Sequence, residues 1–273
     1  MSRARDVTHQ LRFTKPNLER HMNLKFDDVG TGTPVVLVHG LGATGNVFGA
    51  QVAALSPSFR VVVPDVRGCG RSDKAPISID ALVADVVELI DGAGFESVHL
   101  VGHSLGTVIV QRLALEHPQM VRSIALIGPI QAAPEAAKTA IRDRAEQARK
   151  LGLAGIADAT VKGGTSPETK RDHPELAAFV RELVMRQDPE MYAQTCEMIV
   201  GLEPAAIEKL RIPALVVTGD QDATSPPATA KGIADKIPGS KYVELPECGH
   251  WTPIEKAAAV NELLVEFLTK ANA

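Results

Sequence analysis

A serine flanked by glycines, in the stretch GHSLG at residues 102–106, is the first feature of the sequence that could carry chemistry. An apolar segment that reads as a strand precedes it, and a segment with helical spacing follows it. The pattern fits G-x-S-x-G, in which a sharp strand-to-helix turn holds the Ser104 hydroxyl out as a nucleophile. Gly102 and Gly106 have no side chains, so neither position would clash with its neighbours at the turn. A glycine-rich turn with an incidental serine is the alternative.

A serine hydroxyl is a poor nucleophile at neutral pH and needs a general base. Among the eight histidines, His250 follows the last predicted strand, so it lies at the carboxyl edge of the sheet, as Ser104 does. The base needs an acid to fix its tautomer, and both Asp220 and Asp222 follow another strand at this edge. We favour Asp222, which lies further into its loop, and expect Asp220 to hold the turn. Of the other histidines, His39 and His99 lie in predicted strands and His103 adjoins Ser104 but points to the other side of the turn. The rest lie in the N-terminal segment (His9 and His21), at a helix end (His117) or in a helical insertion (His173).

Seven short runs rich in Val, Leu and Ile predict the strands that position these side chains. Most of the runs are continuous rather than alternating, which is typical of central parallel strands buried on both faces. The predicted strands are residues 24–29, 34–39, 60–65, 97–102, 123–128, 214–219 and 241–246.

Helical patterns alternate with the strands and predict helices at 78–94, 226–239 and 253–270. This alternation predicts an α/β fold, with an open, mostly parallel central sheet and helices on both faces. Residues 131–205 interrupt it, with helices predicted at 134–152, 173–187 and 188–201 and a polar, glycine-rich connection at 161–172. We interpret 131–205 as a helical cap inserted into a core domain formed by 1–130 and 206–273.

Composition limits the classes of partner. The 273 residues carry a net charge of −4, which gives no electrostatic reason to expect nucleic acid or an anionic membrane. The N-terminal residues 1–13 lack the apolar region of a secretory signal, and we expect a cytoplasmic protein. Three widely separated cysteines, Cys69, Cys196 and Cys248, predict neither a disulfide framework nor a zinc site. We expect no metal, no cofactor, and a monomer or homodimer.

The order Ser104, Asp222, His250 and several further motifs resemble the α/β-hydrolases over about residues 24–270. The motifs are HGLG (39–42), DVRGCGRS (65–72), GHSLG (102–106), GDQDATSP (219–226) and CGHW (248–251). The resemblance implies a Ser-His-Asp triad and an oxyanion hole formed by the backbone N–H groups of Leu41 and Leu105. It also implies structural roles for His39 and for the DVRGCGRS loop.

Within this family, the cap segment DPEMYAQTCEMI and the last two motifs resemble the 3-oxoadipate enol-lactonases of aromatic catabolism. Those enzymes commonly carry an aromatic segment where this chain reads VKGGTSPETK, so a larger or looser pocket is expected here. Trp251 after the histidine also occurs in carbon–carbon bond hydrolases of ring-cleavage products. For the substrate pocket we select Trp251, Tyr192 and Arg186. Arg186 or Arg181 would suit a substrate carboxylate, because a guanidinium group binds one bidentately.

The sequence therefore predicts a serine hydrolase that cleaves a small carboxylic ester or lactone through an acyl-enzyme, with an enol-lactone as one candidate. Three alternatives stay open. The protein could be a carbon–carbon bond hydrolase, an acyltransferase or peracid-forming enzyme that uses the same serine, or a small-molecule receptor of this fold with slow turnover.

Overall fold

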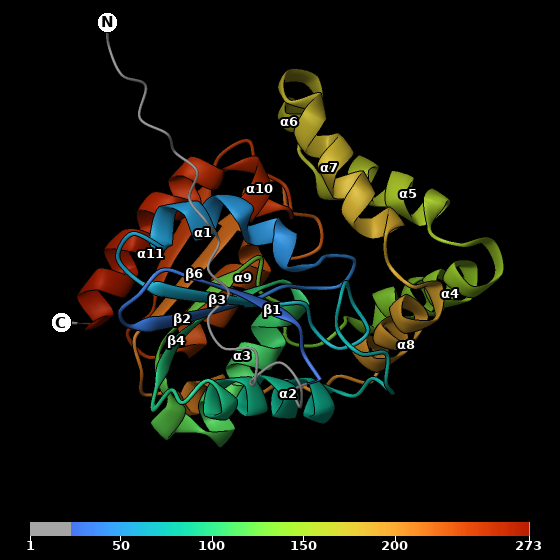
Figure 1. Ribbon diagram of the computed structural model, residues 1–273. Helices are drawn as coiled ribbons and strands as arrows, with labels where there is room; N and C mark the ends of the chain where they lie inside the picture. Colours follow the sequence, from blue (N-terminus) through green and yellow to red (C-terminus); the bar gives the residue numbers. More distant parts are fainter. Residues whose placement is uncertain (1–22, 273) are drawn as a thin grey trace, which may run out of the picture.

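One seven-stranded sheet forms the centre of the protein in a computed structural model that describes residues 23–272 (Figure 1). The strand order is β1-β3-β2-β4-β5-β6-β7; β1 pairs antiparallel with β3, and the other pairs are parallel. The strands are β1 (Phe26–Val29), β2 (Pro34–Val38), β3 (Arg60–Pro64), β4 (Val98–His103), β5 (Val121–Ile127), β6 (Ala214–Gly219) and β7 (Lys241–Leu245). The predicted fold class is confirmed, and each predicted strand has its counterpart. The N-terminal residues 1–13, His9 and His21 lie outside the described residues.

Helices cover both faces of the sheet, with α1 and α11 on one side and α2 and α3 on the other (Figure 1). The helices of the core are α1 (Gly49–Leu55), α2 (Ile79–Gly92), α3 (Leu105–Glu116), α9 (Pro227–Lys236), α10 (Thr252–Glu255) and α11 (Ala257–Asn272). Short 3₁₀ turns occupy Gly45–Phe48, Pro118–Met120 and Ile207–Lys209. Two layers of helix on one twisted sheet are the arrangement that buries continuous apolar strands.

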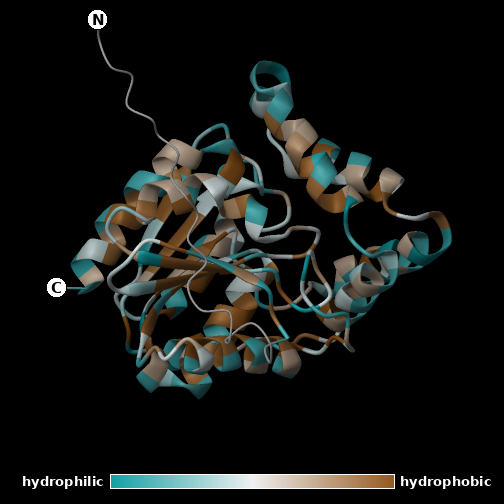
Figure 2. Ribbon diagram, in the orientation of Figure 1, coloured by the Kyte–Doolittle hydropathy of each residue, from teal (hydrophilic) through white to brown (hydrophobic). Residues whose placement is uncertain are grey.

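The strands are mostly apolar and appear largely in brown in Figure 2, and their side chains belong to two buried clusters between the sheet and its helices. Every residue of β4 and of β6 is buried. On β4, for example, Leu100 packs in one cluster with α2 and α3, while Val101 packs in the other with α1 and α11. Each fully buried aliphatic side chain contributes about 1.5–3 kcal/mol relative to exposure, so the sheet is a rigid platform for the loops at its edge.

Five helices lie between β5 and β6, and we call them the cap: α4 (Glu135–Leu151), α5 (Ala154–Gly164), α6 (Pro167–Asp172), α7 (Pro174–Met185) and α8 (Pro189–Val200). They stand to one side of the sheet and its helices (Figure 1). The division into a core of 1–130 and 206–273 and a cap of 131–205 stays a prediction.

The connection expected at 161–172 is wrong, because α5 continues to Gly164 and α6 occupies Pro167–Asp172. The Ser166 hydroxyl caps α6 by accepting a hydrogen bond from the Thr169 N–H, and Pro167 stands at the first helical position. Both are standard helix-start signals. The residues SPET therefore signal a helix start, but the glycines and charged residues around them led to the prediction of an irregular connection.

The single helix expected at 253–270 is also wrong, because the chain forms α10 and α11 with a break at Lys256. Lys256 has φ −126° and ψ 45°, outside the helical region. The break leaves α10 as one turn, and the carboxylate of Glu255 folds back to accept a hydrogen bond from the Trp251 N–H at its start.

Candidate active site

Ser104 occupies the turn between β4 and α3 with φ 54° and ψ −121°. It is one of two non-glycine residues among 23–272 with a positive φ. Such a backbone costs about 1–3 kcal/mol, so surrounding contacts must hold it. The Ser104 N–H donates to the Ile127 carbonyl at 3.0 Å, and its own carbonyl accepts from the Thr107 N–H and hydroxyl. The turn thus holds the serine in a strained conformation at the carboxyl end of a central strand.

The glycines beside Ser104 are required by close backbone packing rather than by a positive φ. A Cβ on Gly106 would overlap the carbonyl oxygen of Val38 on the adjacent strand β2. A Cβ on Gly102 would lie 2.6 Å from the Gly106 carbonyl oxygen. Any side chain at either position would push α3 away from the sheet, so these glycines let the helix begin directly behind the serine.

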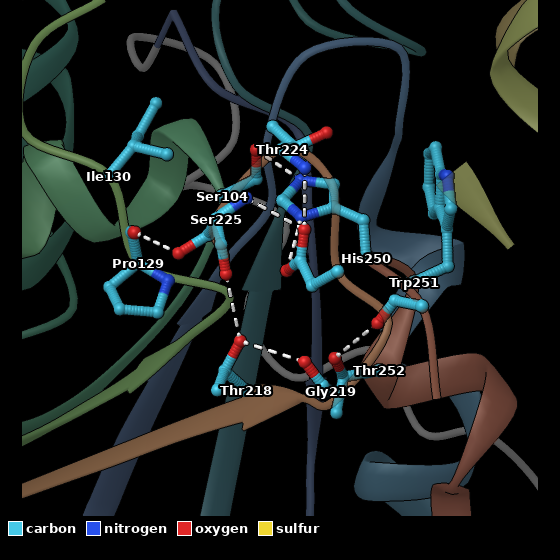
Figure 3. A network of polar contacts seen from close by, with 12 residues as sticks. Ser104, Pro129, Ile130, Thr218, Gly219, Thr224, Ser225, His250, Trp251 and Thr252 are labelled. Atoms are coloured by element: carbon cyan, nitrogen blue, oxygen red, sulfur yellow. Dashed lines mark hydrogen bonds and ion pairs between the residues drawn. The ribbon is translucent and has the colours of Figure 1, made fainter. Parts of the chain in front are cut away.

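The His250 imidazole lies beside Ser104 (Figure 3), and its other ring nitrogen contacts Asp222. Its Nε2 is 2.9 Å from the Ser104 Oγ, and its Nδ1 is 2.8 Å from the Asp222 Oδ2. An ionised carboxylate only accepts hydrogen bonds, so Nδ1 carries the proton and Nε2 is free to accept the serine proton. The structure brings these three buried side chains together from the segments that follow β4, β6 and β7.

Asp222 is held ionised although it is buried. Burial raises the pKa of its carboxyl, but His250 and the N–H groups of Ser225 and Thr224 more than offset this and hold the pKa below its ordinary value of 3.8. The Oδ1 atom accepts from Thr224 at 2.8 Å and from Ser225 at 2.7 Å, which leaves Oδ2 for His250. Asp220 instead accepts from the Cys248 N–H at 3.0 Å. Only Asp222 of this pair reaches the histidine.

The predicted oxyanion donors belong to the loop after β2 and to the first turn of α3. A Cβ on Gly40 would lie 2.7 Å from the Ser104 Cβ and 3.1 Å from the Leu105 nitrogen, so this loop runs directly past the serine. Leu41 follows in the same loop, and Leu105 is the first residue of α3. Backbone N–H groups at a helix start favour a developing negative charge. The oxyanion role of Leu41 and Leu105 stays a prediction.

His39 and Asp65 hold this loop in place through hydrogen bonds to its backbone. The His39 Nε2 accepts from the Val66 N–H at 2.9 Å, which leaves Nδ1 to donate to the Gly40 carbonyl. Burial lowers the pKa of His39, consistent with this neutral form. Asp65 accepts from the Gly45 N–H and from the backbone and guanidinium of Arg71. His39 and the DVRGCGRS loop therefore make structural contacts around the site.

His103 contacts the candidate base, a position that the sequence did not suggest. Its Nε2 donates to the His250 carbonyl at 2.8 Å, and its ring centroid lies 5.1 Å from that of His250 and 5.7 Å from the Trp251 ring. Burial, and next the charge of His250, lower the pKa of His103 to about 3. A neutral His103 supports the His250 loop without a second positive charge beside the imidazole.

Acidification is expected to destabilise the protein through its buried histidines. Burial lowers the pKa of His99 to about 4 and that of His103 to about 3, from an ordinary value of 6.5. Below pH 6.5 the unfolded chain therefore binds protons that the folded chain does not, and stability falls with pH. Between pH 7.5 and 4.5 each histidine should remove about 2 kcal/mol from the free energy of unfolding, measured by urea titration.

A variant tests the assignment of these buried histidines. His99→Asn should make the pH dependence shallower, because it removes one of the two groups with a lowered pKa. Equal slopes in the wild type and the His99→Asn protein would contradict the assignment.

The pocket candidates lie in different surroundings. Tyr192 on α8 is buried, and its ring packs close to Gly42, which belongs to the same loop as Leu41. A Cβ added to Gly42 would lie 3.5 Å from that ring. Trp251 is buried beside His250, with its indole nitrogen 3.2 Å from the ideal Cβ position of Gly164 in the cap. Arg186 follows α7 and is exposed, and Arg181 forms an ion pair with Asp158. The pocket role of Trp251, Tyr192 and Arg186 stays a prediction.

Residues 23–272 contain no group of three or more His, Cys, Asp and Glu side chains that could hold a metal ion. None of the helices described there is long and apolar enough to cross a membrane.

Comparison with known proteins identifies relatives along almost the whole chain. Residues 35–263 match the model of the alpha/beta hydrolase family. A 2-hydroxymuconate semialdehyde hydrolase of a Pseudomonas species is 30% identical over 258 residues, which is 90% of this chain and 90% of that protein. A bifunctional epoxide hydrolase 2 from Rattus norvegicus is 26% identical over 96% of this chain, which spans only 56% of that longer protein.

Solved structures give the same result. A thermophilic esterase from Thermogutta terrifontis superimposes with a TM-score of 0.88 at 30% identity, covering 92% of this chain and 94% of the other. The enol-lactonase from Burkholderia xenovorans has a TM-score of 0.85 at 30% identity, covering 90% and 96%. The similarity extends over the cap as well as the sheet, since nine tenths of each chain are matched.

Proposed function

The chain belongs to the alpha/beta hydrolase family, and from this premise we propose that it is a serine hydrolase of small carboxylic esters or lactones. The observation that carries the proposal is the His250 imidazole placed between the Ser104 hydroxyl and the ionised Asp222. Fold alone would not suffice, because one fold supports many chemistries.

The first half of the proposed reaction forms an acyl-enzyme. The Ser104 Oγ attacks the substrate carbonyl carbon while its proton passes to the His250 Nε2. The carbonyl oxygen becomes an oxyanion beside the N–H groups of Leu41 and Leu105, each worth about 2.7–4 kcal/mol in such sites. As the intermediate collapses, the bond to the leaving oxygen breaks and His250 returns the proton to that oxygen. Asp222 stabilises the imidazolium in between.

The second half of the reaction releases the acid. Water gives a proton to the His250 Nε2 and attacks the acyl carbon, and the bond to the Ser104 Oγ then breaks as the serine regains its proton. These steps need no group beyond the residues named. A lactone follows the same course, except that its leaving oxygen stays attached to the acyl chain.

The relatives guide the choice of substrates. The esterase and enol-lactonase structures favour oxygen esters and lactones, including an enol-lactone. The relative that hydrolyses 2-hydroxymuconate semialdehyde favours cleavage of a carbon–carbon bond as the second candidate. Both reactions would use the same serine and the same base.

A panel of substrates tests the proposed function. It contains p-nitrophenyl acetate and butyrate, a γ-lactone, enzymatically generated 3-oxoadipate enol-lactone and a ring-cleavage dienoate, each with Ser104→Ala protein as the blank. We expect multiple turnovers of at least one ester or lactone, with a burst of p-nitrophenol approaching one per chain if deacylation is slow.

Two outcomes would change the conclusion. Turnover of the dienoate alone would replace the ester and lactone function by carbon–carbon bond cleavage. A single slow event without further turnover on every compound would contradict the hydrolase and favour a small-molecule receptor of the same fold, to be followed by a thermal-shift ligand screen.

A further inference from the structure

The cap is hydrogen-bonded directly to the loop that carries the candidate base. The His250 N–H donates to the Gly164 carbonyl at the end of α5, at 2.8 Å. The preceding residue, Gly249, has no space for a side chain, since a Cβ there would lie 2.6 Å from the same carbonyl oxygen. The backbone of His250 is therefore bonded to the cap, while its imidazole is bonded to the core residues Ser104 and Asp222.

The Glu255 carboxylate lies at the centre of this junction and is buried. Its Oε2 accepts from two groups of the cap, the Ser166 N–H at 2.8 Å and the Thr169 hydroxyl at 2.9 Å. The same oxygen accepts from the Gly249 N–H at 3.1 Å, and Oε1 accepts from the Trp251 N–H at 3.0 Å. Gly249 and Trp251 are the two neighbours of His250. One carboxylate thus holds the cap and both sides of the candidate base.

A purely local role for Glu255 would use only part of this arrangement. As the last residue of α10 it satisfies the Trp251 N–H at the start of that one-turn helix, a common use of a carboxylate. That role needs neither Ser166 nor Thr169, which are 86 or more positions away in the sequence. A buried carboxylate with donors from two parts of the fold keeps them together, because losing one donor leaves its negative charge undersolvated.

We propose that Glu255 is a positioning residue that couples the seating of the cap to the placement of the His250 imidazole. When the cap segment 164–169 packs against the core, the backbone N–H groups of residues 249–251 are all bonded. Glu255 accepts from those of Gly249 and Trp251, and the Gly164 carbonyl accepts from that of His250. When that segment moves, the backbone of His250 moves with it. The inference rests on the proposed function, since it assumes that His250 is the base, and it makes catalysis sensitive to the cap. A misplacement of about 1 Å can lower the rate by about a hundredfold.

The test removes one donor on the cap side of the junction and, in a separate variant, changes the Glu255 carboxylate itself. Thr169→Val deletes the hydroxyl that donates to Glu255, Thr169→Ser keeps it, and Glu255→Gln replaces one carboxylate oxygen by a group that cannot accept. Glu262→Gln on α11 is the control, because it removes the same charge from an exposed position. The measurements are kcat and KM on the best substrate of the panel, and amide hydrogen exchange of residues 249–251 and 164–169.

We expect kcat to fall about tenfold in Thr169→Val and more in Glu255→Gln, with KM changed less than kcat. Thr169→Ser and Glu262→Gln should behave as the wild type. In Thr169→Val, residues 249–251 should exchange faster although the substituted residue lies in the cap.

Wild-type kcat together with unchanged exchange at 249–251 in Thr169→Val would overturn the coupling and reduce Glu255 to a structural residue of α10. If Glu255→Gln does not fold, the comparison of Thr169→Val with Thr169→Ser still decides whether the cap and the His250 loop are coupled. If the wild type hydrolyses nothing, the proposed function fails, and the exchange data alone show whether the cap and the His250 loop are coupled.

Discussion

Replacing Ser104 by alanine is expected to lower kcat for any hydrolysed ester or lactone by about 10⁵- to 10⁶-fold, the effect of deleting the nucleophile of such a triad. The loss follows from the geometry, since Ser104 is the hydroxyl that lies 2.9 Å from the His250 Nε2. Residual hydrolysis above the rate in water would come from binding and the oxyanion hole. Steady-state kinetics of the purified variant give the result.

The Ser104→Ala protein should fold normally, which separates loss of chemistry from loss of structure. The contacts that fix the turn use the backbone of Ser104, so its N–H still donates to Ile127 and its carbonyl still accepts from Thr107. The thermal unfolding midpoint should therefore stay close to that of the wild type. In mass spectrometry after acid quenching, wild type should carry an acyl adduct that the variant lacks. Substantial hydrolysis by the folded variant would contradict the assignment of Ser104.

Replacing Asp222 by asparagine should lower kcat by about 10⁴-fold without disturbing the fold. The amide oxygen can keep the hydrogen bonds from Thr224 and Ser225, which places the amide NH₂ against the His250 Nδ1. His250 then has to carry its proton on Nε2, where it cannot accept the proton of Ser104. The measurement is kcat on the same substrate, with circular dichroism to verify folding.

Asp220→Asn is the matched control for this prediction. Asp220 lies two positions away and binds the Cys248 N–H, a bond that an amide oxygen can also accept. We expect it to retain nearly the full rate. A larger loss in Asp220→Asn than in Asp222→Asn would mean that the wrong carboxylate has been assigned as the partner of His250.

Cys248 and Trp251, which lie on either side of His250 in the sequence, are both buried. Cys248 is buried, and burial raises the pKa of its thiol to about 12, so it stays protonated at neutral pH. Trp251 fills space against Gly164, in the segment that lacks the aromatic residues implied by the resemblance to enol-lactonases. An aromatic ring therefore lies beside this segment of the cap, but it comes from the loop of the base.

Local sequence determined the strands, their order along the chain and the candidate nucleophile. Strong apolar runs such as those of β4 and β6 specify buried strands by themselves, and G-x-S-x-G has meaning only between a strand and a helix. The position of His250 after the last strand placed it at the correct edge of the sheet. These features depend on residues close together in the sequence, which is why they could be predicted.

Tertiary structure decided what depends on distant partners. Asp220 and Asp222 belong to one loop, but the Asp220 carboxylate meets the Cys248 N–H whereas the Asp222 carboxylate meets the His250 ring. The same is true of His103, which meets the His250 carbonyl across 147 positions, and of Glu255, which meets Thr169 across 86. A hydrogen bond between groups so far apart forms only once the sheet has brought its loops to one edge, and no local pattern encodes that meeting.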